Sequence, residues 1–184
     1  MQKTKRLATD AILAALYIIL TAYISIRAGN LRITFASLPI IVCALLYGPK
    51  DACIVVVLGE FMNQMLSYGF TVTTPIWLIP PLFRALIIGV CASRAARKGT
   101  MLERNPAAYY LACAAGALAT TLANTAVIWL DSVLLGYYNF AYVFGDFFLR
   151  LATSGVTVAI VATLAIPVAA ALRRTGFGMA ATAG

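Results

Sequence analysis

Apolar residues fall in six runs that are separated by short polar breaks. The runs cover approximately residues 7–26, 33–47, 52–68, 75–93, 107–130 and 140–172. A helix rises 1.5 Å per residue, so about 20 residues cross the roughly 30 Å hydrocarbon core of a bilayer. The second run is shorter than that length and the sixth is longer. The pattern predicts an all-α integral membrane protein, a bundle of six transmembrane helices that forms a single membrane domain over residues 1–184.

Glycine, proline and charged residues mark the breaks between these runs. The segment 27–32 contains Gly29 and Asn30, which favour a turn. Pro80 and Pro81 lie inside the fourth run, where the loss of two backbone donors predicts a bent helix. The polar segment 94–106 separates four predicted helices from the last two.

Composition supports the membrane assignment and excludes several classes of protein. Hydrophobic residues make up 62% of the chain and charged residues 11%, with a mean hydropathy of +0.92. An average soluble domain is about 45–50% apolar and about 25% charged, so both a soluble globule and a disordered chain are excluded. The net charge of +8 lies in clusters between apolar runs and not along one solvated face, which argues against nucleic-acid binding.

The basic residues also predict the orientation in the membrane. Six helices place both termini on one side, and ten of the fourteen lysines and arginines fall on that side. They are Lys3, Lys5, Arg6, Lys50, Arg94, Arg97, Lys98, Arg104, Arg173 and Arg174. Basic loops face the cytoplasm, so we expect a multi-pass protein of the plasma membrane with cytoplasmic N- and C-termini.

Two charged residues lie deep inside predicted helices. Glu60 and Arg84 are each about nine residues from the cytoplasmic ends of neighbouring runs, which places both about 13–14 Å into the membrane. Asn63 and Gln64 extend the polar face that begins at Glu60. The two charges either form an ion pair that fixes the bundle or line a polar cavity.

Further charges lie near the ends of the helices. Asp146 and Arg150 have the i, i+4 spacing of a helical ion pair. Arg27 and Arg32 flank the first outer loop, where they are either solvated or available to a ligand. Asp10, near the cytoplasmic end of the first run, is expected to be an interfacial charge.

Aromatic residues gather in the predicted outer loops. They are Tyr68, Phe70, Trp77, Trp129, Tyr137, Tyr138, Phe140 and Tyr142. An aromatic belt at the membrane interface accounts for such a set. Aromatic rings beside arginines at the mouth of a bundle also make a site for a flat anionic ligand.

The chain carries no signal of catalysis or of a metal or organic cofactor. It contains no histidine, and its four cysteines lie inside apolar runs without metal-ligand spacing. No pairing of nucleophile and base is evident, so we do not expect an enzyme.

Two local patterns resemble a known family. Ala11 and Ala15 form an AxxxA motif in the first helix, and the segment Leu31-Arg-Ile-Thr-Phe-Ala-Ser-Leu-Pro39 is followed by Leu-Leu-Tyr-Gly48-Pro49. With the length, the six helices and the basic inner loops, these features resemble the S-components of energy-coupling factor (ECF) vitamin transporters over essentially the whole chain.

The resemblance implies a substrate-capture subunit without a resident cofactor. In that family the AxxxA motif docks on a transmembrane coupling subunit, and two ATP-binding subunits supply the energy. This chain has no GxxxxGK[ST] loop, which agrees with ATP hydrolysis on a partner. The family's site, mapped here, comprises Arg27, Arg32, Tyr68, Phe70, Trp77 and Tyr137, with Asn124, Asp146 and Arg150 below them; Arg84 is a further candidate from its depth.

The arginines favour an anionic vitamin-like ligand. Folate is the first candidate, with Asp131 or Asp146 as an acidic partner for its pterin ring, followed by pantothenate and lipoate. The alternative is a stand-alone secondary carrier or channel that uses Glu60 and Arg84 as its polar path. Such a protein would transport solute without an ATP-driven partner.

Overall fold

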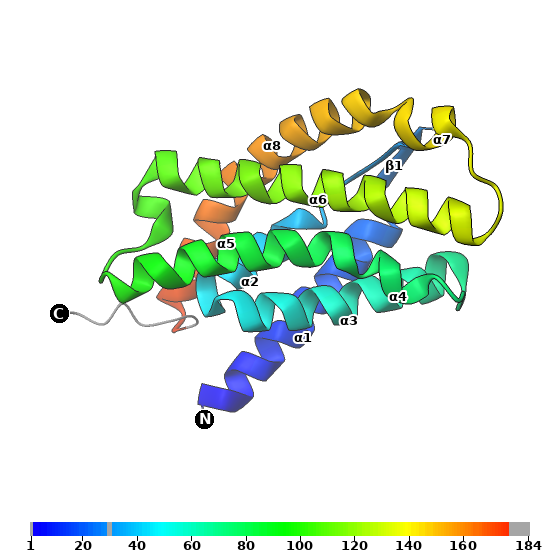
Figure 1. Ribbon diagram of the computed structural model, residues 1–184. Helices are drawn as coiled ribbons and strands as arrows, with labels where there is room; N and C mark the ends of the chain where they lie inside the picture. The colour runs from blue at the N-terminus through cyan, green and yellow to red at the C-terminus, as the bar shows by residue number, and fades with distance from the viewer. Residues whose placement is uncertain (1, 29–30, 177–184) are drawn as a thin grey trace.

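The computed structural model describes residues 2–28 and 31–176, with the side chains of 2–3, 26–28 and 31–33 outside this description. Six helices form a bundle in this part of the chain (Figure 1). They are α1 (Gln2–Ala22), α2 (Ser37–Tyr47), α3 (Pro49–Tyr68), α5 (Ile79–Arg97), α6 (Pro106–Leu134) and α8 (Phe147–Arg174). Shorter elements are β1 (Ser25–Ala28), β2 (Leu31–Thr34), α4 (Thr74–Trp77), η1 (Leu102–Arg104) and α7 (Phe140–Phe144).

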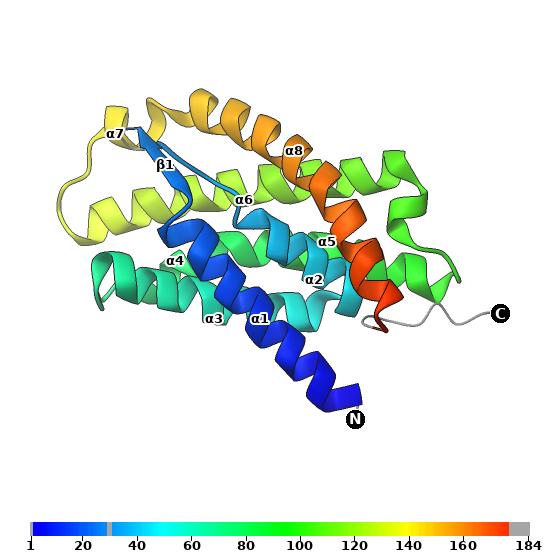
Figure 2. The same cartoon turned by 180° about the vertical axis from the view of Figure 1, so that it is seen from behind.

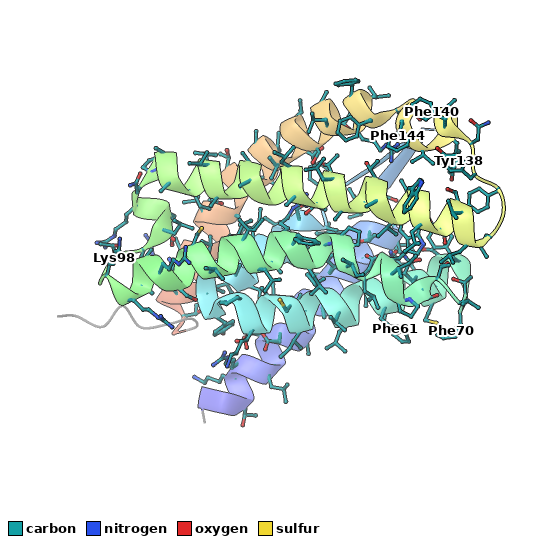
Figure 3. The ribbon with its side chains drawn as sticks, in the orientation of Figure 1. Phe61, Phe70, Lys98, Tyr138, Phe140 and Phe144 are labelled. Atoms are coloured by element: carbon teal, nitrogen blue, oxygen red, sulfur yellow. The ribbon has the colours of Figure 1, made fainter. Side chains whose placement is uncertain are left out.

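The two ends of the bundle differ. Helix α1 begins and α8 ends at one end, which we call the terminal end (Figures 1 and 2). The elements α4, α7 and β1 lie at the opposite end, which we call the distal end. The side chains follow the same division, with Lys98 at the terminal end and Phe70, Tyr138 and Phe140 at the distal end (Figure 3).

Helix α2 is the centre of the bundle. It packs against α1, α3, α5 and α8, and every residue from Pro39 to Leu46 is buried. A helix that is apolar on all sides is stable only when protein surrounds it. Its 11 residues extend about 16 Å, so α2 occupies only part of the bundle's length. It ends at Tyr47, and the next residue, Gly48, has a φ of 87° that allows the chain to turn directly into α3.

The expected all-α, six-helix architecture is present, with one feature that the sequence did not predict: a short β-hairpin connects α1 to α2. Strands β1 and β2 are antiparallel, with Ser25 opposite Thr34 and Ile26 opposite Ile33. The expected first helix, 7–26, therefore ends at Ala22, and the second, expected from residue 33, begins at Ser37. The β-branched residues Ile26, Ile33 and Thr34 favour extended backbone, and the hydropathy of the runs conceals this preference.

Two of the expected helices are broken near their distal ends. The helix expected over 75–93 consists of α4 and α5, which restarts with Pro80 in its first turn, where a missing N–H costs no hydrogen bond. The prolines therefore lie in the first turn of α5, directly after the interruption at Leu78. The helix expected over 140–172 consists of α7 and α8, with Gly145 and Asp146 between them. The helices expected over 52–68 and 107–130 are present with slightly longer bounds.

Helix packing brings backbones close together at two glycines. A Cβ atom on Gly59 of α3 would lie 2.6 Å from Cδ1 of Tyr17 of α1. A Cβ atom on Gly89 of α5 would lie 2.5 Å from Cα of Pro49. The first contact joins α1 to α3, and the second joins α5 to the start of α3. Small residues at helix interfaces allow this approach in membrane bundles.

Ion pairs connect neighbouring elements at the terminal end. Arg6 of α1 pairs with Asp51 of α3, its Nη2 donating to Oδ1 over 2.7 Å. Arg173 of α8 pairs with Glu103 of η1 and donates to the carbonyl oxygen of Leu45 at 2.8 Å. Asp10 is not interfacial as expected, because it is buried and accepts from the Cys43 thiol of α2 at 3.6 Å.

The surface suits a lipid environment. Large apolar side chains on the outer faces of the helices are exposed, including Leu111, Leu122 and Val156. Three helical segments of the described chain are long and apolar enough to span a membrane: Thr74–Arg97, Pro106–Leu134 and Phe140–Arg174. The central α2 is apolar but shorter, and α1 and α3 carry charged residues in their first turns.

Candidate ligand-binding site

A cavity of about 670 Å³ lies between the start of α2 and the distal end. Ala36, Ser37 and Ile40 at the start of α2 form one boundary. The walls come from α1, α3, α5, α6 and α8, and residues of α4, α7 and the loops line the distal side. The cavity therefore occupies the part of the bundle that the short central helix leaves unfilled.

Glu60 organises the α3 wall of the cavity. The Tyr17 hydroxyl donates to Oε2 of Glu60 at 2.6 Å, and Nε2 of Gln64 donates to Oε1 at 2.8 Å. Nδ2 of Asn63 donates to Oε1 at 3.2 Å. A carboxylate that accepts several hydrogen bonds is stable in a buried, polar setting. The close contact of Tyr17 with Gly59 places the phenol on this carboxylate.

Arg84 enters the cavity from α5 and does not pair with Glu60. The ion pairs found among the described residues do not include these two side chains. Arg84 instead donates to the Ser37 hydroxyl, and its Nε is buried without a hydrogen-bond partner in the described part of the chain. Both charged residues line the cavity, so the second of the two expected arrangements is the one observed.

Arg150 is a second buried guanidinium in the cavity wall. It is 8% exposed and donates through Nη2 to the carbonyl oxygen of Val143. Its Nε and Nη1 have no partner among the residues that the structure describes. The expected pair with Asp146 is not formed: the Arg150 N–H donates to the Asp146 carbonyl oxygen at 2.8 Å, but the guanidinium reaches the carbonyl of Val143 and not the Asp146 carboxylate.

Asp131 connects segments at the distal side of the cavity. Trp77 Nε1 of α4 donates to Asp131 Oδ1 at 3.4 Å, and the Tyr137 hydroxyl donates to Oδ2. The ring of Tyr137 meets that of Tyr142 edge to face, with centroids 5.8 Å apart. Partial burial raises the pKa of the Tyr137 hydroxyl above its usual value, and the Asp131 carboxylate raises it further. Tyr137 therefore remains a neutral donor to Asp131 at physiological pH.

A sequence comparison identifies the family. Residues 1–174 match the model of the ECF-type riboflavin transporter S component family. The chain belongs to this family. The expected resemblance is confirmed, and so is the expectation that the protein is a transporter subunit and not an enzyme.

Solved structures share the fold of this S component at low sequence identity. The S component of a bacterial ECF transporter aligns with a TM-score of 0.63 and 18% identity, covering 93% of this chain and 99% of its own. ThiT from Listeria monocytogenes aligns with a TM-score of 0.65 and 17% identity, covering 96% and 97% respectively. No curated protein matches the sequence.

Six of the ten residues expected to bind a ligand in this S component line the cavity. They are Tyr68, Trp77, Arg84, Asn124, Tyr137 and Arg150. Phe70 is 70% exposed and, like Asp146, does not line it. The side chains of Arg27 and Arg32 lie outside the described residues, although their backbones pair across the hairpin.

Sequence reasoning missed most of the hydroxyl groups in the cavity of the S component. Thr120 and Thr121 line it from α6, and Thr153, Ser154 and Thr157 line it from α8. Their spacing was a usable signal, because positions three and four apart in a helix share one face. Tyr17 of α1 had no such signal, since its role depends on the contact with Gly59 of α3.

Proposed function

We propose that this S component captures a riboflavin-like vitamin, with riboflavin as the first ligand to test. The observation that supports this most is the cavity of about 670 Å³, which combines aromatic and hydrogen-bonding side chains in a member of a family described by riboflavin transport. Riboflavin has a flat ring system with a polar edge and a hydroxylated side chain. Trp77, Tyr137 and Tyr142 offer aromatic surface. The threonines of α6 and α8 offer partners for hydroxyl groups.

The two arginines of the cavity favour a ligand with strong hydrogen-bond acceptors. Buried guanidinium donors without partners are unfavourable, and a ligand acceptor that occupies them removes that penalty. Ring carbonyl oxygens satisfy this requirement, and so does a carboxylate. Folate, pantothenate and lipoate are therefore the competitors to test beside riboflavin.

In this proposal, two ATP-binding subunits supply the energy for uptake, and a coupling subunit connects them to this chain. Ala11 and Ala15 are exposed on α1, which leaves room for another helix to approach. Cytoplasmic termini, as the basic residues indicate, direct the distal end and its cavity toward the outside of the cell. Capture then takes place outside and energy is supplied inside.

The test is a fluorescence titration of riboflavin with the purified protein in detergent. We expect saturable quenching of flavin fluorescence at one ligand per chain. Displacement by folate, pantothenate or lipoate at lower concentration would replace riboflavin with that vitamin. Failure of all four to bind would refute the proposal. Native mass spectrometry of the purified protein provides an independent view of any ligand retained.

The stand-alone carrier or channel remains the second candidate, because Glu60 and Arg84 both line the cavity. The two functions differ in what the isolated chain does. Vesicles that contain only this protein should bind riboflavin and accumulate none. Accumulation without partner subunits would favour the carrier and exclude the capture function as stated.

A further inference from the structure

Three segments that are separate in the sequence meet at the distal side of the cavity. They are α4 with Trp77, the last turns of α6 with Asp131, and the α6–α7 connection with Tyr137. Tyr137 is 44% exposed and also lines the cavity, so it lies at the opening. Asp131 is 6% exposed and holds a hydrogen bond to each of the other two segments.

The position of Tyr137 is fixed by the end of α6. The N–H of Tyr137 donates to the carbonyl of Ser132 at 3.0 Å, and the N–H of Gly136 donates to that of Val133 at 3.3 Å. Gly136 has a φ of 76°. These features define a Schellman motif, which reverses the chain at a helix C-terminus. The reversal returns the Tyr137 ring over the last turn of α6, within reach of Asp131.

Asp131 binds its two partners through neutral donors only. The ion pairs in the described part of the chain do not involve it, so the carboxylate is buried against an indole N–H and a phenol O–H. Hydrogen bonds to an ionised acceptor are stronger than neutral ones. Removing either donor therefore weakens the connection between the segments without introducing a new charge.

We propose that Asp131 is a positioning residue that ties Trp77 to Tyr137 across the opening of the cavity and thereby sets how fast ligand enters and leaves. Ligand passes when these hydrogen bonds open, and the same hydrogen bonds re-form over the empty and the occupied cavity. The effect is therefore on both rate constants and not on the equilibrium between them. Only the identity of the ligand rests on the proposed function.

The first experiment needs no ligand. Trp77 and Trp129 are the two tryptophans of the chain, so Trp129→Phe leaves Trp77 as the sole fluorophore. In this background we expect Asp131→Asn and Tyr137→Phe each to increase the acrylamide quenching constant of Trp77 about twofold or more. The reason is that the indole, no longer held by Asp131 and Tyr137, becomes more accessible to the quencher. Tyr138→Phe is the matched control, since the neighbouring tyrosine does not line the cavity. Unchanged quenching in both variants, or an equal increase in the control, would overturn the proposal.

The second experiment is stopped-flow binding of riboflavin to the same variants with Trp129 restored. Loss of one hydrogen bond to a charged group predicts that the association rate constant rises about tenfold together with the dissociation rate constant, and Tyr138→Phe, the matched control, should change neither. A purely structural role would raise the dissociation rate alone and weaken affinity in proportion, which would contradict the inference. Absence of riboflavin binding by the wild type would count against the proposed function, and the quenching experiment would still decide the role of Asp131.

Discussion

The contact between Gly59 and Tyr17 offers a sharp test of how the cavity is built. Alanine at position 59 places a Cβ atom 2.6 Å from Cδ1, 2.9 Å from Cγ and 3.1 Å from Cβ of Tyr17. Carbon atoms in contact prefer about 3.5–4.0 Å, so the two helices must separate by about 0.9 Å or the ring must leave its position. The closest atoms lie near the root of the side chain, which limits rotation as a way to escape.

The expected cost of Gly59→Ala has two parts. Overpacking a helix interface destabilises a protein by about 1–3 kcal/mol, which corresponds to a fall in Tm of roughly 2–12 °C for a chain of this size. Displacement of the Tyr17 ring also lengthens its 2.6 Å hydrogen bond to Glu60. A hydrogen bond to a charged group contributes about 1.5–3 kcal/mol. If the ligand depends on the position of Glu60, its affinity should fall about tenfold or more.

Two other glycines provide controls for this experiment. Gly89→Ala meets the backbone of Pro49 at 2.5 Å and should lower the Tm without a comparable loss of affinity, because neither residue lines the cavity. Gly155→Ala in α8 has open space around the new methyl group and should raise helix stability by roughly 0.5–1 kcal/mol. The assay is thermal unfolding in detergent together with a riboflavin titration. Wild-type Tm and affinity in Gly59→Ala would refute the reasoning.

Three further substitutions test other parts of the molecule. Arg150→Met removes a buried charge with two unpartnered nitrogens, so the empty protein should be equally or more stable while riboflavin affinity falls about tenfold; a loss of stability with unchanged affinity would contradict this. Ala15→Leu should abolish vitamin uptake by cells that express the complete importer and leave binding intact, and loss of binding would argue against a docking role. Asp51→Asn breaks the pair with Arg6 and should lower unfolding free energy by no more than about 1 kcal/mol, less in high salt, as Tm measurements would show.

Much of the helical pattern could be predicted from the sequence because burial in lipid or protein leaves long apolar runs. The ends of the helices near the distal end could not be predicted from the sequence. Ile26 and Ile33 are equally apolar in a strand and in a helix, so hydropathy did not separate the hairpin from its neighbouring helices. Pro80 was correctly singled out, but whether a proline bends a helix or begins one depends on the residues that pack around it.

The candidate site was partly predictable for a related reason. A charged residue deep in an apolar run, such as Arg84, is costly enough to stand out from sequence alone. Its partner was not predictable, because equal depth does not fix the direction in which two side chains point. Arg84 meets Ser37 of α2, and Glu60 meets Tyr17 of α1. These contacts depend on where the central helix starts and on the absence of a side chain at Gly59.

Because α2 is short, its start and the walls of the cavity have separate effects on ligand binding. The depth available to a bound molecule is set by where the backbone of α2 starts, and each extra helical turn there would advance about 5.4 Å into that space. Substitutions on the surrounding walls alter which chemical groups are recognised and leave that depth unchanged. A common scaffold with different wall residues is a physically simple way for proteins of one architecture to admit different small molecules.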